Sequence, residues 1–488
     1  MKINTFQHYL YKKNSMKSKA TSSILIFLLL THFVSANGDH SDSRNTASEE
    51  NSISVNPDGV NPCISDLQYS ILESRIKENS LALGRFSYLH PATENTITSL
   101  SWPLRPASNL TDCSYYFISA YVDQDTAAGA IRDFNCGNNT YDSHRGTDIS
   151  IWPFNFYKMD NNLVEVIAAA PGTIIDKHDG EYDRNCAATS NPANYVLIQH
   201  ADGSYALYWH MKNGSITSKA IGQSVSVGEY LGVVGSSGSS SGPHLHFEIW
   251  AGSTSATRLD PFSGSCNTLN ASSWWAAQKP YKETAVIKAS VHTTDAVFPA
   301  CPATETSNQS TSFQVPFQGP GLSAGYAKFY AFFRNEVSGL PATLSILNPN
   351  GSTYLTWNYT SANDVKARAW SWSKVLPTNP GTYTFQAIYN GITCSSFFDI
   401  TTSTGINHTG ISSDLKIYSS IENRHTTFEL KHNSIRQIEI FNILGAKVFS
   451  MEGSSSAMEI NSELTGGVYF YRLMDANQLV YSGKLFIQ

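Results

Sequence analysis

The stretch Gly242-Pro-His-Leu-His-Phe-Glu248 places polar side chains at every second position, a pattern typical of a β-strand. Residues i and i+2 of a strand point to the same side, about 6–7 Å apart along the chain. His244, His246 and Glu248 are therefore expected on one face, where the two imidazoles can line one cleft. The Gly-rich run 235–242 is too flexible for a strand and suits a loop bordering that cleft.

A second cluster, His144-Arg-Gly-Thr-Asp148, supplies the residue types that complete a metal site. Two imidazoles and one carboxylate form a three-ligand cradle for zinc, with a fourth position open to water. Gly146 allows a tight bend and a close approach to the metal. Leu207-Tyr-Trp-His210 adds a further imidazole in a strand-like run. An isolated His-x-His is a weak signal, but the combination in one β-rich chain indicates hydrolytic chemistry.

Two features bear on which side chains move protons. The sequence contains no His-Glu-x-x-His, so the glutamate base of helical zinc sites is absent and histidines must serve. Glu248 has two open interpretations: it supports a metal-binding histidine, or it is a solvated carboxylate at a strand end. The remaining histidines His178, His200 and His292 have no partner at ligand spacing and are expected at the surface.

The N-terminal residues have the features of a targeting segment. Several lysines precede the apolar run Ile24 to Leu30, and Val34-Ser-Ala36 fits a small-x-small cleavage site. We predict a signal peptide over residues 1–36, although Met16 could be the true start and a membrane anchor is the alternative. The apolar run is short for a bilayer span, and no stable membrane span is expected after signal removal.

Composition limits the class of protein. A chain of 488 residues is too long for one ordinary domain, and 41% hydrophobic residues suffice for several cores. Frequent Tyr and Phe among Asn, Ser and Thr favour β-structure. The formal net charge is −6 and no basic cluster occurs, so nucleic acid is not an expected partner.

Cysteine usage agrees with export, because disulfides form in oxidising compartments. The seven cysteines leave at least one thiol unpaired or bridging two chains. Cys301 and Cys394 lie near opposite ends of one predicted domain and are expected to pair. No Cys-x-x-Cys occurs, so a cysteine-based zinc site is not predicted.

The predicted fold is mainly β. A single helix is expected at Ile64 to Asn79, and Thr401 to Ser413 is rich in Ser, Thr and Gly. We predict a β-rich domain that carries the candidate metal site, a β-sandwich-like domain and a small β-sandwich domain. The predicted boundaries are 1–36 signal peptide, 37–95 linker or pro-segment, 96–283 domain of the metal site, 284–402 β-sandwich, 403–413 linker and 414–488 C-terminal unit.

Three motifs carry a family resemblance. His144 to Asp148, Tyr208-Trp-His-Met211 and Gly242 to Glu248 resemble the signatures of the LytM/lysostaphin-type zinc endopeptidases, and the similarity extends over about residues 100 to 265. The resemblance implies that residues 96–283 form an antiparallel β-sheet metallopeptidase domain, with one Zn²⁺ in a groove of the compact sheet. It implies His144, Asp148 and His246 as zinc ligands, and His210 and His244 as catalytic residues. A long insert between Asp176 and Tyr195 departs from the family pattern.

The C-terminal unit has a resemblance of its own. Ile438-Glu-Ile-Phe-Asn-Ile-Leu-Gly-Ala-Lys447, Leu464 to Tyr471 and Lys484 to Gln488 resemble the sorting domain of type IX secretion, although an expected Pro-Asn-Pro near Tyr418 is missing. The resemblance implies type IX machinery as a partner and outer-membrane passage, followed by release or surface attachment. An ordinary β-sandwich appendage is the alternative.

Together these patterns predict a secreted zinc metalloendopeptidase acting on peptide bonds, with peptidoglycan cross-links as the leading substrate. An extracellular protease on glycine-rich matrix protein is the second possibility. A non-catalytic wall-binding or hydrolase-activating module is the third. The cleaved bond, the role of the middle domain, and whether residues 37–95 inhibit the enzyme stay open at this level.

Overall fold

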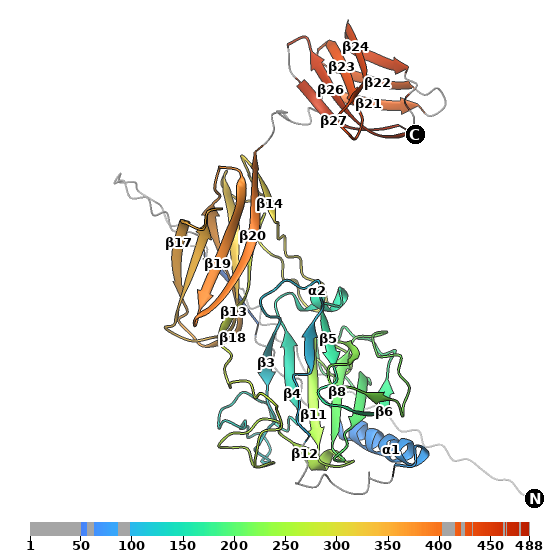
Figure 1. The fold of residues 1–488 in the computed structure, drawn as a ribbon, viewed down its shortest axis with the longest axis vertical. Helices are drawn as coiled ribbons and strands as arrows, with labels where there is room; N and C mark the ends of the chain where they lie inside the picture. The colour runs from blue at the N-terminus through green and yellow to red at the C-terminus, as the bar shows by residue number, and fades with distance from the viewer. Residues whose placement is uncertain are drawn as a thin grey trace, which may run out of the picture. The chain divides into compact units, whose positions relative to one another are not determined.

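The computed structural model describes residues 50–55, 63–85, 98–402 and, with short gaps, 415–487. Strands dominate these residues, and the predicted mainly β fold is confirmed (Figure 1). The predicted signal peptide and the 403–413 linker lie outside the described residues. Among those described, neither helix combines the length and the apolar character that a bilayer span requires.

The peptidase region is built on one antiparallel sheet in the order β3-β4-β11-β8-β7-β6-β9, with β12 paired to β11. Along β11, Leu245, Phe247 and Ile249 enter the core on one face of the sheet, and His244 and His246 alternate with them. A smaller sheet, β10-β5-β2, packs in the same core. The strands are β2 (Leu104–Pro106), β3 (Tyr116–Ala120), β4 (Thr147–Ile151), β5 (Val164–Ile167), β6 (Gly172–His178), β7 (Asn194–Gln199), β8 (Tyr205–Met211), β9 (Ser224–Val225), β10 (Tyr230–Val233), β11 (His244–Trp250) and β12 (Arg258–Leu259).

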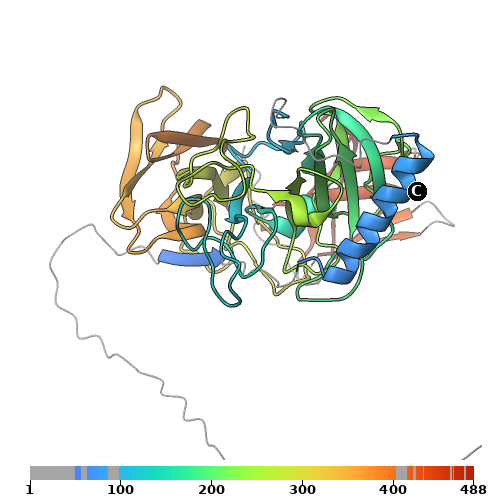
Figure 2. The same ribbon diagram turned by 90° about the horizontal axis from the view of Figure 1, so that it is seen from below.

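Helix α1 (Asp66–Ala82) covers the second face of this sheet (Figure 2). It corresponds to the helix expected at Ile64 to Asn79. Ser65 begins it with a capping box to Gln68, which satisfies backbone N–H groups of the first turn. Tyr69, Leu72 and Ile76 recur at helical spacing and are buried in a core shared with sheet residues such as Trp209 and Trp250.

The middle region is a β-sandwich, as its sequence predicts. One sheet has the order β1-β18-β15-β13 and the other β14-β20-β19-β16-β17. Phe329 and Trp372 of the first sheet share a core with Phe385 and Phe398 of the second. The short helix α2 (Asn155–Asp160) and the 3-10 turn η2 (Ser255–Thr257) belong to the peptidase region. The strands are β1 (Glu50–Val55), β13 (Ala285–His292), β14 (Ser312–Val315), β15 (Tyr326–Glu336), β16 (Pro341–Leu347), β17 (Thr353–Thr360), β18 (Val365–Val375), β19 (Gly381–Tyr389) and β20 (Ile392–Thr402).

Strand β1 is notable because it comes from the N-terminal region, far from its partner in sequence. It pairs antiparallel with β18, from Glu50 opposite Trp372 to Val55 opposite Ala367. The N-terminal region therefore contacts both large units: β1 extends a sandwich sheet, and α1 packs on the peptidase sheet.

Three disulfides join Cys113 to Cys394, Cys136 to Cys266 and Cys186 to Cys301, which leaves Cys63 as the single unpaired cysteine of the seven. The expected Cys301–Cys394 bridge is wrong. Two of the bridges connect the peptidase region to the sandwich, so packing between the units decided the pairing, whereas the prediction assumed pairing within one unit. Cys186 lies in the insert between Asp176 and Tyr195, which is thereby tied to the sandwich.

The C-terminal unit contains two small sheets, β21-β22-β25 and β24-β23-β26-β27, around a core that includes Phe428, Ile438, Ile440 and Leu473. The predicted small all-β unit is therefore present. The first residues of the stretch Ile438 to Lys447, up to Phe441, lie in β23. The strands are β21 (Leu415–Ser420), β22 (His425–Leu430), β23 (Ile435–Phe441), β24 (Lys447–Ser455), β25 (Ala457–Asn461), β26 (Gly467–Asp475) and β27 (Val480–Ile487).

Candidate metal centre

The pairing of β11 with its two neighbours brings the sequence motifs together. His246 lies opposite Asp148 of β4 on one side and opposite Trp209 of β8 on the other. These three strands run side by side in the peptidase sheet (Figure 1). His144 precedes β4 in a loop, and His210 lies near the end of β8. All five histidine and aspartate side chains predicted for the site therefore meet in one place.

The inner cluster consists of His144, Asp148 and His246, all buried. Asp148 Oδ1 lies 2.8 Å from His246 Nδ1 and 3.2 Å from His144 Nε2. The two ring nitrogens are 3.2 Å apart. Three donor atoms this close, on three side chains, can share a single cation.

Hydrogen bonds on the outer side of each ring fix which nitrogen faces inward. His144 Nδ1 donates to the Tyr121 carbonyl oxygen at 2.6 Å, and His246 Nε2 donates to Glu248 Oε1 at 2.7 Å. In a neutral imidazole the inward nitrogen then carries the lone pair, as metal-binding histidines require. Two lone pairs facing a carboxylate repel one another unless a cation lies between them. The donor set therefore fits a zinc ion.

The ionisation of Asp148 and His246 agrees with this assessment. Burial alone would raise the pKa of Asp148, but His144 and His244 nearby hold it well below its ordinary value. Burial alone would lower the pKa of His246, yet the neighbouring Cys63, Asp148 and Glu248 raise it well above its usual range. Without a metal, a protonated His246 thus donates a hydrogen bond to the Asp148 carboxylate. A bound metal would displace that proton.

Glu248 fixes the orientation of His246. It is fully buried, and it accepts hydrogen bonds from His246, from the Tyr69 hydroxyl at 2.6 Å and from Trp250 Nε1 at 2.6 Å. Burial would raise its pKa, but these donors lower it, which keeps the carboxylate ionised. The interpretation of Glu248 as a solvated carboxylate at a strand end is therefore wrong, whereas the contact with His246 is the one that a supporting carboxylate requires.

His210 and His244 form a second pair beside the cluster, with ring centroids 4.6 Å apart. His210 Nδ1 donates to the Ser237 carbonyl oxygen at 2.5 Å, and His244 Nδ1 donates to that of Gly242 at 2.8 Å. Burial lowers the pKa of both rings, that of His210 well below its usual value. Each is therefore a neutral imidazole whose Nε2 can accept a proton.

The backbone of His210 is strained in the way functional residues often are. Its φ is +67°, in the left-handed region that non-glycine residues rarely adopt. This conformation ends the regular part of β8. It also positions the ring so that Nδ1 reaches the Ser237 carbonyl.

Two residues of the site were not predicted from the sequence. The Tyr141 ring stacks on His144 at 4.1 Å between centroids, and its hydroxyl donates to Asp148 Oδ2 at 3.0 Å. Cys63 Sγ lies 2.8 Å from His210 Nε2. The odd number of cysteines was a signal for Cys63, whereas nothing in the sequence singled out Tyr141.

The expectation that the other histidines are surface residues is wrong for two of them. His200 is buried, and its Nδ1 donates to the Pro171 carbonyl oxygen at 2.9 Å. His292 is buried beside the Ser290 hydroxyl, 2.7 Å from its Nε2. The Ser307 carbonyl and the Ser290 hydroxyl lie at the two ring nitrogens of His292, whereas His200 has a partner at Nδ1 and none at the buried Nε2. His178 is partly exposed and pairs with Glu181 at 2.6 Å.

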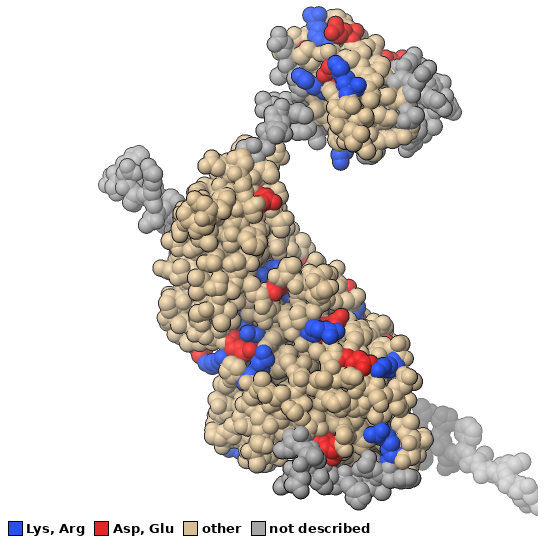
Figure 3. All heavy atoms as spheres, in the orientation of Figure 1, with Lys and Arg blue, Asp and Glu red and all other residues tan. Residues whose placement is uncertain are grey.

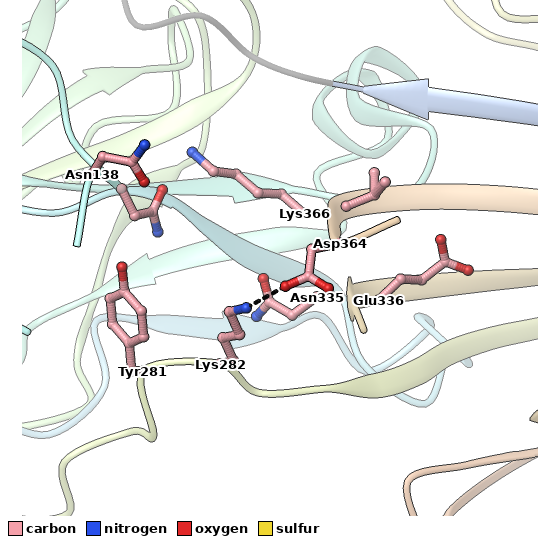
Figure 4. A pocket seen from close by; sticks show the side chains of 9 residues that line it. Asn138, Tyr281, Lys282, Asn335, Glu336, Asp364 and Lys366 are labelled. Atoms are coloured by element: carbon pink, nitrogen blue, oxygen red, sulfur yellow. Dashed lines mark hydrogen bonds and ion pairs between the residues drawn. The ribbon is translucent and has the colours of Figure 1, made fainter. Parts of the chain in front are cut away.

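A separate cavity of about 290 Å³ lies where the peptidase region meets the sandwich (Figure 4). Tyr281, Lys282, Asp364 and Lys366 are among its lining residues, and Lys282 pairs with Asp364 at 2.7 Å. None of the histidines of the metal centre lines it. The cavity is therefore not part of the centre.

Comparison with known proteins agrees with the geometry. Residues 143–261 match the model of peptidase family M23, and residues 417–488 match that of the secretion system C-terminal sorting domain. The chain carries an M23 peptidase domain and a C-terminal sorting domain. The M23 match contains all five predicted site residues.

Named relatives match short stretches of the chain. Over 55 residues the chain is 51% identical to the DD-carboxypeptidase/endopeptidase Mpg of Neisseria meningitidis serogroup B, covering 11% of this chain and 12% of the relative. Over 86 residues it is 38% identical to the cell division protein DipM of Caulobacter vibrioides, covering 17% and 13%. The chain thus spans a small part of the length of these relatives.

Solved structures similar to the chain include the catalytic domain of lysostaphin from Staphylococcus simulans. That match has 24% identity and a TM-score of 0.18, and it covers 24% of this chain and 76% of that one. A zinc containing peptidase from Vibrio cholerae matches at 20% identity with a TM-score of 0.21, covering 34% and 39%.

Gly146 provides a test of how tightly the centre is packed. A Cβ there would lie 2.8 Å from both Cε1 and Nε2 of His246 and 2.8 Å from the Phe247 carbonyl oxygen. We expect Gly146→Ala to displace the His246 ring and to weaken metal binding about tenfold or more. Metal titration followed by calorimetry measures this change.

Gly180→Ala is the matched control, because Gly180 has φ +104° and no neighbour within 4 Å of an added Cβ. It adds backbone strain without touching the centre, so its metal affinity should equal that of the unmodified protein. Equal affinities for the two variants would contradict a requirement for close packing at His246.

Proposed function

We propose that this protein is a secreted zinc metalloendopeptidase that hydrolyses peptide bonds, with peptidoglycan cross-links as its leading substrate. The observation that carries the proposal is the convergence of His144 Nε2, His246 Nδ1 and Asp148 Oδ1 within 3.2 Å of one another. The match of the surrounding domain to peptidase family M23 supports it. Relatives named as metalloproteases add further support.

In this proposal His144, Asp148 and His246 hold the zinc ion, one per catalytic domain. When bound, zinc supplies Lewis-acid polarisation of a carbonyl and a water-derived nucleophile at neutral pH. Glu248 holds the His246 ring in the orientation that binding requires. Tyr141 holds Asp148 through the opposite carboxylate oxygen.

His210 and His244 move protons. Both rings are neutral, and the carbonyl oxygens of Ser237 and Gly242 hold their Nδ1–H groups, so Nε2 faces the centre. An imidazole placed in this way accepts a proton from water and returns it to the leaving amine. His244 Nε2 lies 3.6 Å from Asp148 Oδ1, so that carboxylate would stabilise the imidazolium formed in between.

Export is the second part of the proposal. The C-terminal sorting domain supports delivery by type IX secretion machinery to the cell surface or beyond, after a signal peptide at residues 1–36 has directed the chain across the inner membrane. Figure 3 shows acidic and basic side chains intermingled on the visible face, without a large basic area. A protein outside the outer membrane no longer faces its own peptidoglycan. Foreign walls or glycine-rich matrix proteins are therefore the substrates we propose.

Single substitutions test the metal ligands. We expect His246→Ala and Asp148→Ala to lose both zinc and activity, because each removes an inner donor atom. His210→Ala and His244→Ala should keep near-stoichiometric zinc and lose about 10²–10⁴-fold in rate. Metal analysis and hydrolysis of cell walls by protein recovered from the growth medium measure both properties.

His178→Ala is the control for this series, because His178 is partly exposed and contacts Glu181 and Tyr195, neither of which belongs to the centre. Finding His244→Ala metal-free while His246→Ala keeps its metal would reverse the assignment of the pair. Full zinc occupancy without hydrolysis of any wall would favour the non-catalytic alternative.

A panel of substrates tests the specificity. We expect cleavage of glycine-containing cross-bridges or peptides, abolished by a chelator and restored by zinc. Oligoglycine-bridged walls, directly cross-linked walls and elastin should be compared at equal enzyme, with products identified by mass spectrometry. Cleavage of casein-like chains at bulky residues, with none of these three degraded, would refute the proposal.

Deletion of residues 414–488 tests the sorting function. The truncated chain should stay in the cell envelope, since the machinery would no longer recognise it. Immunoblots of cell and medium fractions measure its distribution. Normal amounts of the truncated protein in the medium would rule out a sorting role.

A further inference from the structure

Cys63 is chemically unlike the other six cysteines of the chain. Those six form three disulfides, whereas Cys63 is a buried thiol just before α1. Buried unpaired cysteines are common as small apolar residues. The position of this one is different, because its sulfur faces a cluster of metal-ligand side chains.

The Cys63 sulfur lies beside the second histidine pair. Sγ lies 2.8 Å from His210 Nε2, and Cys63, His210 and His244 place their ligand atoms within 4.8 Å of one another. Its thiol also interacts with the side chains of His246 and Tyr141. The thiol therefore lies among residues of both the inner cluster and the second histidine pair.

Catalytic zinc sites have three protein ligands and an open position, whereas sites with four protein ligands are closed. A thiolate is a strong ligand for zinc and would compete well with water for the fourth position. We propose that Cys63 is a fourth metal ligand, which makes the full chain a latent form of the enzyme whose N-terminal segment must move before substrate can bind. This inference rests on the proposed metal centre.

Contacts along α1 hold Cys63 in this place. The Tyr69 hydroxyl donates to Glu248 Oε1, the same atom that holds His246. The Arg145 guanidinium, next to His144 in sequence, lies 4.4 Å from the centre of the Tyr69 ring. The helix thus contacts residues that support the metal ligands as well as the site itself.

Two polar contacts farther along α1 fix the helix to the sheet. Arg75 forms a bidentate ion pair with the buried Asp176, with Nε 2.6 Å from Oδ2 and Nη2 2.7 Å from Oδ1. Glu73 Oε1 accepts hydrogen bonds from the backbone N–H and the hydroxyl of Ser255, both at 2.9 Å. With the buried Leu72 and Ile76, these contacts make α1 a cover over the face of the sheet that carries the histidines.

The position of Cys63 in the sequence favours a reversible cover over a structural metal site. Cys63 lies outside residues 143–261, which match the M23 model and contain the other five site residues. The fourth ligand therefore belongs to a segment that can move away from the centre while the three inner ligands stay in place. His210 and His244, the proposed proton carriers, would then become accessible to a substrate.

Cobalt replacement tests the inference on the full chain. A thiolate bound to Co²⁺ gives a near-ultraviolet charge-transfer band, and six of the seven cysteines are in disulfides, so such a band can come only from Cys63. We expect the band in the unmodified chain and its loss in Cys63→Ser at an unchanged cobalt stoichiometry of one. His210→Ala should keep the band, because that ring contacts the sulfur without being an inner ligand.

Activity gives a second readout. Cys63→Ser in the full chain should hydrolyse cell walls about tenfold faster or more, because the rate follows the fraction of molecules in the open state. Adding Arg75→Ala, which removes the ion pair with Asp176, should raise the rate further. Arg75→Ala alone, with Cys63 intact, should keep the band. Its rate of cell-wall hydrolysis measures how far a loosened α1 opens the centre while Cys63 is still present.

The outcomes separate this inference from the proposed function. Cobalt bound without the band would overturn Cys63 as a ligand and leave the metallopeptidase proposal intact. The band together with no hydrolysis by any variant would support Cys63 as a metal ligand and refute the proposed peptidase activity. Failure of the chain to bind cobalt or zinc at all would refute both.

Discussion

The antiparallel pairing of β4 with β11 is the constraint on which the centre depends. It sets His246 directly opposite Asp148, and the loop before β4 then brings His144 to the same point. A shift of β11 by one residue would turn His246 to the opposite face of the sheet, away from Asp148. The apolar residues Leu245 and Phe247, buried in the main core, oppose such a shift, so burial of the hydrophobic face fixes the geometry of the polar face.

Hydrogen bonds on the side of each ring that faces away from the centre fix the orientation of the four histidines. Backbone carbonyls hold His144, His210 and His244, and a buried carboxylate, Glu248, holds His246. In each case the acceptor determines which nitrogen faces inward. The proposed ligands differ from the proposed proton carriers in where each ring lies relative to Asp148, since a hydrogen bond to a fixed acceptor orients all four rings.

The N-terminal region and two of the disulfides connect the peptidase domain to the β-sandwich. Two bridges connect it to the sandwich, and β1 adds an edge strand to the same sandwich. Helix α1, with Cys63 before it, packs on the histidine-bearing face. The sandwich thus stabilises the surroundings, whereas the segment around Cys63 bears directly on access to the centre.

The sequence by itself determined the mainly β fold, the alternation of β11, the five side chains of the centre and the C-terminal sorting unit, because these depend on local periodicity and on motif spacing. Only the tertiary structure decided the rest. Disulfide partners such as Cys113 and Cys394 are 281 residues apart and meet through packing between units. Cys63 reaches the centre because α1 docks on the sheet. His200 and His292 are buried beside groups distant in sequence, the Pro171 carbonyl for His200 and the Ser307 carbonyl for His292. Contacts between residues distant in sequence leave no periodic signal in either segment, so only the folded chain shows them.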